Sequence, residues 1–392
     1  MKKIISILMA AVFAIGMTIP AFASDEKAPL SFDADGSFTI MHVTDTHLQE
    51  SNIDKSVWLI GQACDKEKPD LVVIGGDNVQ NDDSAEITKN HITKLMQEFE
   101  IRGIPVAVTF GNHDSEEGAL SREELMAFYN TFSCSYSVDD GETLSGCGTY
   151  NIPVLSSDLS AVKFNIWVFD SGNYDADGNY GYVKKDQIDW YRSVSDALAL
   201  ENGGEKVYSL AFQHIIVPEI YDVLKKADYK SLFTFEHIIN DGDYYMSDPT
   251  QTNYGTLNET PCSGYYNDGQ FDAMVQQGDV LGIFSGHDHT NAFAVKNQGI
   301  NITNSLSTRY NDDAFSTQYG YRIIEINATD TSTYNTRVVH WYNMITLSNF
   351  TQYDNSTWAF GIAINGFFQK TFQNLYRELA AFLTGRTITY AD

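Results

Sequence analysis

The chain has 392 residues, with 52 Asp and Glu against 25 Lys and Arg, a formal net charge of −27 and 43% hydrophobic residues. Enough apolar material is present to bury a large core, which argues against a disordered chain. The acidity argues against binding to a nucleic-acid backbone, because neutralising phosphates takes clustered Lys and Arg. The length suits one large domain with extensions, or two domains of about 150 to 200 residues.

The N-terminus has the features of a signal peptide. Lys2 and Lys3 precede an apolar run over residues 4–17, and Ala21-Phe22-Ala23 comes before polar residues. The run is shorter than the roughly 20 apolar residues that a membrane-spanning helix needs. We therefore expect a cleaved signal peptide at residues 1–23 and a secreted or periplasmic protein without stable membrane insertion.

Export would permit disulfide bonds, and the chain has four cysteines. Cys134 and Cys147 lie close in sequence and flank a polar, Gly-containing segment, so we expect a bridge between them. Cys64 ends a helical stretch and is expected to be a buried thiol, whereas Cys262 follows Pro261 in a loop. The spacings fit no Cys-x-x-Cys zinc site.

Short apolar strands alternate with helical stretches along most of the chain. Strands are predicted at residues 38–43, 70–74, 104–110, 162–169, 206–212 and 280–284. Helices are predicted at residues 54–66, 84–101, 184–200 and 270–276. This alternation is typical of βαβ units and a largely parallel sheet.

Two segments depart from the alternation. Residues 219–267 are rich in Tyr, Asp, Asn and Gly and are predicted to form an insertion or a long loop. Alternating strands then follow to about residue 343. The C-terminal extension, residues 344–392, is predicted to hold a helix at residues 358–383 that packs on the domain.

Five of the predicted strands end in a cluster of Asp, His or Asn. The clusters are Asp45-x-His47, Gly76-Asp77, Gly111-Asn112-His113-Asp114, His214 and Gly286-His287-x-His289. Ligand sites of open α/β sheets form beyond the carboxyl ends of strands, so these side chains are expected to converge. Carboxylate, imidazole and amide oxygen together suit a divalent or trivalent metal such as Mn, Fe or Zn. Seven donors are too many for one zinc ion and fit two metals that share a bridging carboxylate.

The motif order D-x-H, GD, GNH(D/E), H, GHxH resembles the calcineurin-like metallophosphoesterase superfamily. The segments Asp170-Ser171-Gly172 and His214-Ile215-Ile216-Val217-Pro218-Glu219 are similar to its compact purple-acid-phosphatase-related group, which lacks the fibronectin-like domain of larger plant enzymes. The resemblance covers about residues 36–325. It implies an α/β fold, a four-layer α/β/β/α sandwich, in a metallophosphoesterase domain at residues 24–343.

The resemblance also implies a role for each residue. A first metal would be held by Asp45, His47 and His289, a second by Asn112, His214 and His287, and Asp77 would bridge them. A hydroxide shared by the two ions would be the nucleophile. His113 would contact the phosphate and help protonate the leaving group. Asp114 would orient His113 if its carboxylate reaches the ring.

One position departs from the family pattern. Purple acid phosphatases carry a Tyr that binds ferric iron three residues after the bridging Asp, and this chain has Gln80 there. A tyrosinate-to-iron colour is therefore not expected. The identity of the metal pair stays open among Mn, Fe and Zn.

Other residues allow competing interpretations. His237 competes with His214 for the fourth motif, but His214 directly ends an apolar strand and is favoured. The acidic segment 175–179 looks like the start of a calcium loop, but Tyr180 stands where that loop needs Gly, so a solvated turn is expected. The pairs Tyr244-Tyr245 and Tyr265-Tyr266 would either line a cleft or cover core.

The sequence thus predicts an exported hydrolase that acts on small phosphate monoesters with two transition-metal ions. Two alternatives stay open: a phosphodiesterase acting on nucleotides or phospholipid head groups, and a secreted metal-binding protein without catalysis. Most of the acidic residues are expected to form a solubilising exterior, which would repel polyanions. No nucleic-acid partner is expected, and the oligomeric state is left open.

Overall fold

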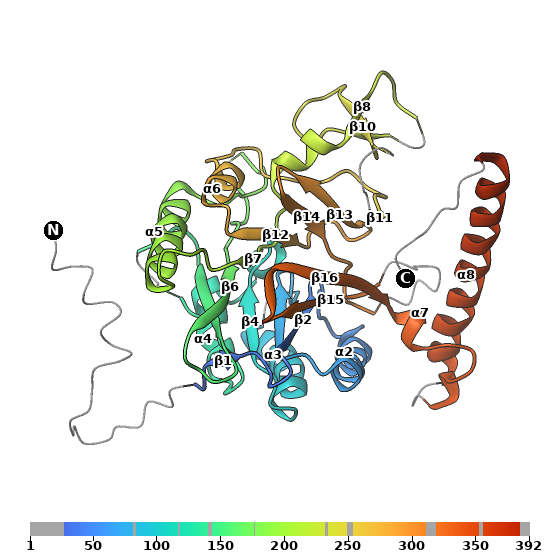
Figure 1. Cartoon of the computed structure of the whole chain (residues 1–392). Helices are drawn as coiled ribbons and strands as arrows, with labels where there is room; N and C mark the ends of the chain where they lie inside the picture. The colour runs from blue at the N-terminus through green and yellow to red at the C-terminus, as the bar shows by residue number, and fades with distance from the viewer. Residues whose placement is uncertain are drawn as a thin grey trace.

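A computed structural model describes residues 27–80, 84–116, 118–139, 143–175, 177–231, 234–248, 254–310, 319–352 and 356–384. Two large sheets lie at its centre and helices cover their outer faces (Figure 1). The arrangement is the four-layer α/β/β/α sandwich expected from the sequence. The predicted signal peptide, residues 1–23, lies outside the described residues.

The first sheet has five strands in the order β16-β15-β2-β3-β4. Its strands are β2 (Ser37–Val43), β3 (Leu71–Gly75), β4 (Val106–Thr109), β15 (Gly320–Asn327) and β16 (Asp330–His340). The first three are parallel, and β15 is antiparallel to both β2 and β16. The crossovers between the parallel strands are α2 (Ile53–Glu67) and α3 (Ala85–Glu100), and α4 (Arg122–Tyr129) follows β4.

The second sheet has eight strands in the order β1-β5-β6-β7-β12-β14-β13-β11. Its strands are β1 (Leu30–Ser31), β5 (Tyr150–Leu155), β6 (Val162–Val168), β7 (Ser209–Phe212), β11 (Tyr254–Thr256), β12 (Val280–Ser285), β13 (Ala292–Asn297) and β14 (Ile300–Asn304). The central strands β6, β7, β12 and β14 are parallel. Helices α5 (Lys185–Glu201) and α6 (Gln270–Gln277) contribute to the core on its outer side.

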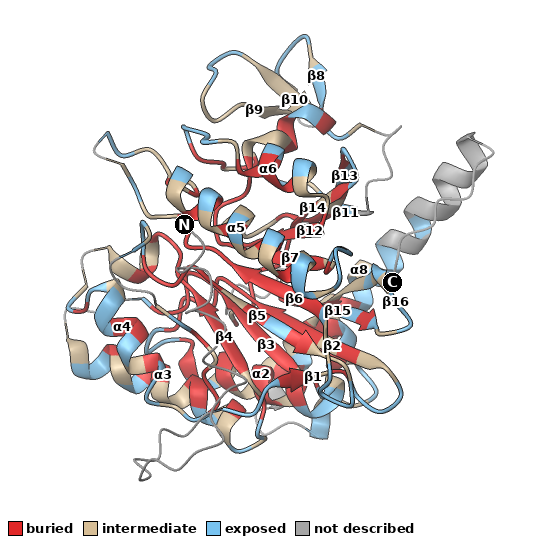
Figure 2. Ribbon diagram, turned by 60° about the vertical axis from the view of Figure 1, so that its left-hand side comes forward, coloured by how far each residue is buried: buried red, intermediate tan, exposed pale blue. Residues whose placement is uncertain are grey.

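Three hydrophobic cores fill the spaces between the four layers, and buried residues run through both sheets in Figure 2. Alternation along β2 assigns its side chains to two of these cores, because successive residues of a strand point to opposite faces. Met41 packs with the α2 and α3 residues, whereas Ile40 packs between the two sheets. Strands buried on both faces explain the near-continuous apolar runs in the sequence.

The predicted insertion is more ordered than a long loop. It begins in a 3-10 helix (Pro218–Val223) and holds a small antiparallel sheet of β8 (Lys225–Ala227), β9 (Phe235–Glu236) and β10 (Tyr244–Met246). The His237 ring stacks on the Tyr221 ring at a centroid distance of 3.8 Å, and the Tyr245 ring packs edge-on against Tyr221. His237 therefore belongs to the packing of this small sheet, not to the cluster at the strand ends.

The described part of the C-terminal extension, residues 344–352 and 356–384, is mostly helical. The short helix α7 (Trp341–Met344) and a 3-10 turn (Phe350–Gln352) precede the long helix α8 (Ser356–Thr384). The start of α8 is anchored by Ala359 and Ala363, which are buried in the core beneath the first sheet. Farther along, Phe367, Phe368 and Phe372 are exposed. In the described part of the chain, no helix combines the length and apolar character that crossing a membrane requires.

The predicted bridge between Cys134 and Cys147 is wrong, because all four cysteines are free thiols. The thiol of Cys134 faces the backbone oxygen of Met96 in α3. Burial raises the pKa of the Cys147 thiol, and Asp139 raises it further. Cys64, Cys134 and Cys147 are buried in the core, which confirms the prediction of a buried thiol at Cys64, and Cys262 is partly exposed.

Candidate metal centre

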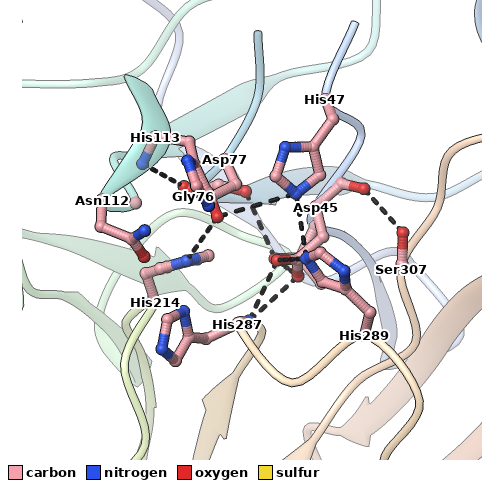
Figure 3. A network of polar contacts seen from close by, with 12 residues as sticks. Asp45, His47, Gly76, Asp77, Asn112, His113, His214, His287, His289 and Ser307 are labelled. Atoms are coloured by element: carbon pink, nitrogen blue, oxygen red, sulfur yellow. Dashed lines mark hydrogen bonds and ion pairs between the residues drawn. The ribbon is translucent and has the colours of Figure 1, made fainter. Parts of the chain in front are cut away.

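The seven predicted ligands lie together at the carboxyl ends of five strands (Figure 3). Asp45 and His47 follow β2, Asp77 follows β3, and Asn112 follows β4. These three strands belong to the first sheet. The second sheet contributes His214 after β7 and the pair His287 and His289 after β12. The centre therefore lies across the edges of both sheets, and each sheet supplies part of it.

Two groups of potential metal ligands share one carboxylate. Asp45, His47, Asp77 and His289 each offer a ligand atom within 4.8 Å of the others. Asp77, His214 and His287 form a second group by the same criterion. Asp77 is common to both groups, and this is the geometry expected of a carboxylate that bridges two ions.

The two oxygens of Asp77 have different surroundings. Its Oδ1 atom accepts a hydrogen bond of 2.8 Å from the backbone N–H of His113. Its Oδ2 atom has no hydrogen-bond partner and lies 3.7 Å from Nε2 of His47 and 3.1 Å from Nε2 of His214. One free oxygen thus faces one histidine from each group.

The backbone at the strand ends is strained. Asp45, His47, Asp77 and His287 all have positive φ angles, of 52°, 40°, 50° and 71°. Residues with a Cβ rarely adopt this region, and such conformations cost about 1 to 3 kcal/mol each. Packing around the four residues must hold them there, and the strain falls where side chains have to turn from a strand end toward a common point.

Gly76 shows how tightly the two sheets meet. Its φ is 96°, and a Cβ at this position would lie 2.6 Å from Nδ1 of His214 and 2.7 Å from the backbone nitrogen of Gly111. Only glycine fits, because any other residue would push apart the loops that carry Asp77, Asn112 and His214.

Several hydrogen bonds fix the orientation of the ligands. Nδ1 of His214 lies 3.0 Å from the backbone oxygen of Gly75, which can only accept, so Nδ1 carries the proton. In the neutral form of the ring, Nε2 then carries no proton, and its lone pair faces Asp77. The Ser307 hydroxyl donates to the backbone oxygen of Asp45 at 2.7 Å, and the His287 N–H donates to the Asp45 carboxylate.

The residues fit a pair of cations. Four buried atoms have no hydrogen-bond partner among the described residues: Asp77 Oδ2, Asn112 Oδ1, His214 Nε2 and His287 Nε2. Asp77 Oδ2 and His214 Nε2 face each other at 3.1 Å, whereas Asn112 Oδ1 and His287 Nε2 face no such group. An unsatisfied buried polar atom costs about 1 to 3 kcal/mol, so the last two indicate a missing partner. Carboxylate, amide and imidazole atoms of this kind are the donors that first-row transition metals take.

The charge states also suit metal binding. Burial opposes ionisation of the two carboxyls, yet His289 beside Asp45 and His214 beside Asp77 hold their pKa values well below the usual range. Burial lowers the pKa of His47 to about 4 and that of His287 to about 3, so both rings are neutral at pH 7. Ionised carboxylates and neutral imidazoles are the forms that coordinate metals.

The protonation of His214 differs from that of His47 and His287. Burial lowers its pKa, but the Asp77 carboxylate outweighs burial and raises the pKa to about 9. In the metal-free protein the ring thus carries a proton opposite Asp77. A metal ion would have to displace that proton.

The structure does not give Asp114 its expected role. His113 begins a 3-10 turn (His113–Ser115), and its Nδ1 donates to the Glu116 carboxylate at 2.6 Å. Both oxygens of Asp114 accept from buried backbone amides, Oδ1 from Asn78 and Val79 and Oδ2 from Gly111. A 3-10 turn brings residues three apart to the same side, so it aligns Glu116, and not Asp114, with His113.

Motif reasoning missed two aromatic residues beside the ligands. The Tyr174 hydroxyl accepts a hydrogen bond of 2.8 Å from Nδ2 of Asn112. The Tyr180 ring stands edge-on to the His287 ring, with centroids 4.3 Å apart. Both tyrosines come from the loop between β6 and α5, which carries none of the five metal-ligand motifs, so only the folded chain reveals their place beside the ligands.

One cation near the centre was also missed. Arg309 lies near enough to His47 and His289 to act electrostatically on both rings. It follows Ser307, whose hydroxyl holds Asp45, and so it stands on the side of the first ligand group. No sequence signal marked it, since an isolated Arg in a loop has no pattern.

Residues 38–291 match the family model described as calcineurin-like phosphoesterase, which is more than half of the chain. The chain belongs to the calcineurin-like phosphoesterase family. Its motifs from Asp45 to His289 all lie inside the matched region. The family binds a dinuclear metal centre, which is the arrangement that the two ligand groups around Asp77 display.

Known proteins with similar sequences carry purple acid phosphatase names. "Probable inactive purple acid phosphatase 14" of Arabidopsis thaliana is 27% identical and aligns with 70% of this chain and 71% of its own. "Probable inactive purple acid phosphatase 29" of the same plant is 26% identical, over 72% and 74% of the two chains. The structure of a dimetal phosphatase from Danio rerio aligns with 78% of this chain over 99% of the Danio rerio chain, with 12% identity and a TM-score of 0.47.

Proposed function

We propose that this protein is an exported phosphatase that hydrolyses small phosphate monoesters at a pair of transition-metal ions, Mn, Fe or Zn. The observation that carries the proposal is the position of the Oδ2 atom of Asp77, which faces His47 of one ligand group and His214 of the other. A lone carboxylate oxygen between two sets of neutral or exchangeable donors suits two ions and not one.

The ligands divide by their groups. Asp45, His47 and His289 would hold the first ion, Asn112, His214 and His287 the second, and Asp77 both. Bound ions would neutralise the phosphate oxygens and activate the attacking water.

The chain itself supplies a proton donor. The His113 side chain is 36% exposed at the rim of the centre, and its ring centroid is 5.3 Å from that of His47. Because Nδ1 is engaged by Glu116, Nε2 is the nitrogen that can give a proton to the leaving oxygen. The backbone N–H of the same residue holds Asp77, so the donor and the bridging carboxylate are fixed relative to each other.

The names of two relatives describe those proteins as inactive. What supports catalysis here is that this chain keeps all seven ligands, the partly exposed His113 and a carboxylate partner for its ring. A protein that only binds metal has no need of a proton donor at the rim. Monoesters are favoured over diesters by the likeness to acid phosphatases, which is an argument from family and not from geometry.

A panel of two esters tests the proposal. Protein loaded with Mn, Fe or Zn is expected to hydrolyse p-nitrophenyl phosphate rapidly and bis-p-nitrophenyl phosphate slowly. Removing the proton donor by His113→Ala should lower turnover about 100-fold or more while both ions stay bound. Faster cleavage of the diester would replace the monoesterase assignment by a phosphodiesterase, and inactivity on both esters would refute catalysis.

Export has its own test. If residues 1–23 are a signal peptide, the mature protein from a secreting host begins at Ser24. N-terminal sequencing of the protein from the culture medium or periplasm decides this. An intact Met1 on the accumulated protein would contradict export through this segment.

A further inference from the structure

A hydrogen bond outside the two ligand groups fixes the side chain of Asn112. Its Nδ2 atom donates to the Tyr174 hydroxyl at 2.8 Å, and its Oδ1 atom is buried without a partner. An amide has one oxygen and one nitrogen, so engaging the nitrogen determines where the oxygen points. Without this contact, the amide could turn and present its N–H₂ group, which cannot bind a cation.

The next residue in the chain is fixed by a carboxylate in the same place. Nδ1 of His113 donates to Oε2 of Glu116 at 2.6 Å. Burial raises the pKa of the Tyr174 hydroxyl, and a hydrogen bond with the Glu116 carboxylate raises it further, so the two side chains are in contact. Glu116 and Tyr174 thus hold two neighbouring residues with different duties, the ligand Asn112 and the proton donor His113.

Arg122 in α4 keeps the two loops together. Its guanidinium donates to the backbone oxygens of Gly111 and Gly172, at 2.7 and 3.1 Å, and is paired with the buried Asp170. The Ser115 hydroxyl accepts from both Arg122 and Asn173. The loop that carries Tyr174 is therefore tied to the loop that carries Asn112 and His113 by the largely buried guanidinium of Arg122.

We propose that Tyr174 and Glu116 are positioning residues that couple the second ligand group to the proton donor. Tyr174 sets the amide of Asn112 so that its oxygen faces the second ion, and Glu116 sets the His113 ring so that Nε2 faces the leaving group. The inference rests on the proposed function and deepens it. It accounts for a tyrosine and a glutamate that no motif of the sequence assigned.

The first test measures metal binding without substrate. Metal-free Tyr174→Phe protein is titrated with Mn²⁺ or Zn²⁺ by calorimetry, next to the wild type and Tyr182→Phe. Tyr182 lies on the same loop, and its described contacts with Lys184 and Tyr266 are made by its ring. Loss of the orienting hydroxyl should weaken the second ion roughly 10- to 100-fold and leave the first ion unchanged. Unchanged binding of both ions to Tyr174→Phe would overturn the role of Tyr174.

The second test separates positioning of the proton donor from general damage. Glu116→Gln should bind both ions as the wild type does. An alkyl phosphate such as glycerol phosphate needs its leaving oxygen protonated, whereas p-nitrophenolate leaves readily without a proton. Turnover of the alkyl ester should therefore fall at least 10-fold more than turnover of p-nitrophenyl phosphate. Equal losses on both esters would overturn the role of Glu116.

The first test is independent of the proposed function, whereas the second needs an active wild type, so the role of Glu116 falls with the phosphatase proposal. If the metal-loaded wild type hydrolyses neither ester, the phosphatase proposal fails, and the calorimetric titration still decides the role of Tyr174. If the wild type is active and Tyr174→Phe binds metal normally, only the present inference fails.

Discussion

Nε2 of His214 lies 3.1 Å from Oδ2 of Asp77, although the two residues follow strands of different sheets. Nδ1 of the same ring reaches back to Gly75, the last residue of β3. One histidine of the eight-stranded sheet is thus held by the five-stranded sheet at two points. The centre is a junction between the halves of the sandwich, and its occupation should affect the stability of the whole domain.

Metal removal is expected to destabilise the protein. Ligands from both sheets bind together only in the folded state, so an ion that binds this state stabilises it by about 2.7 kcal/mol at a concentration 100 times its dissociation constant. Denaturant unfolding with and without a chelator checks this, and adding back Mn²⁺ or Zn²⁺ should restore the midpoint. An unfolding midpoint that is the same with chelator and with metal would contradict the ligand assignment.

Gly111→Ala is expected to damage both the fold and the centre. A Cβ there would lie 2.1 Å from Oδ1 and 2.5 Å from the backbone nitrogen of Asp77, and 2.6 Å from Nε2 of His214. Forcing these groups apart should cost about 1 to 3 kcal/mol of unfolding free energy and weaken metal binding.

The matched control is Gly361→Ala in α8. A Cβ at Gly361 meets nothing within 4 Å, and alanine in a helix is favoured over glycine by about 0.5 to 1 kcal/mol. This variant should unfold at the same denaturant concentration as the wild type or a higher one. Equal stability of the two variants would show that the approach of Gly111 to Asp77 is not as tight as described.

The stability of the metal-free protein is expected to peak near pH 6.5. Burial opposes the charge on His214, but Asp77 raises its pKa to about 9, so its contribution is complete below the usual pKa and lost as the pH rises toward 9. Burial lowers the pKa of His42 and His287 to about 3 and that of His47 to about 4. Their contributions are complete above the usual histidine pKa and lost as the pH falls toward these values.

Unfolding midpoints in chelator at about pH 5, 6.5 and 9 check the sign of each effect. His214→Gln should show a smaller decline between pH 6.5 and 9 and keep the decline on the acidic side. Part of the alkaline decline stays because burial is outweighed by Asp45, which raises the pKa of His289 as well. A wild-type midpoint that rises steadily from pH 6.5 to 9 would contradict the Asp77–His214 pairing.

The free cysteines give a prediction that is independent of the centre. Protein denatured without reductant should show four reactive thiols, because Cys64, Cys134, Cys147 and Cys262 are all free. Titration with a thiol reagent counts them directly. Two reactive thiols would restore a disulfide bond of the kind that the sequence suggested.

The ligands could be predicted because each stands directly after an apolar strand, where strand ends of a parallel sheet must meet. The residue types at these points are chemically specific, and their order matches one family. The helices and strands flanking them, such as α2 and β3, were placed within one or two residues for the same reason: their apolar periodicity is strong.

Helix α4 and strand β5 were not predicted, for different reasons. Helix α4 begins with a capping box formed by Ser121 and Glu124, and this pattern can be recognised in the sequence. The helix is only eight residues long, so its apolar periodicity is weak. Strand β5 contains Pro153, and proline normally argues against a central strand. It is tolerated because β1 is only two residues long and pairs with Val154 and Leu155, so Pro153 stands where β5 is in effect an edge.

The contacts around the proton donor could not be read from the chain. Adjacency in sequence favoured Asp114 as the partner of His113, but a 3-10 turn decides which neighbours share a side. Tyr174 reaches Asn112 from a loop on the other sheet, so its role depends on how the two sheets pack. Hydrophobic patterns fix which strands are buried but not which loop side chains meet above them.

The most direct measurement is a metal titration of activity. Metal-free protein receives increasing Mn²⁺ or Zn²⁺, and p-nitrophenyl phosphate hydrolysis is followed next to Asp77→Asn. If Asp77 bridges two ions, activity should rise to a plateau at two equivalents per chain, and the variant should bind neither ion tightly and stay inactive. A plateau at one equivalent, full activity of Asp77→Asn, or no hydrolysis at any metal concentration would contradict a two-metal phosphatase.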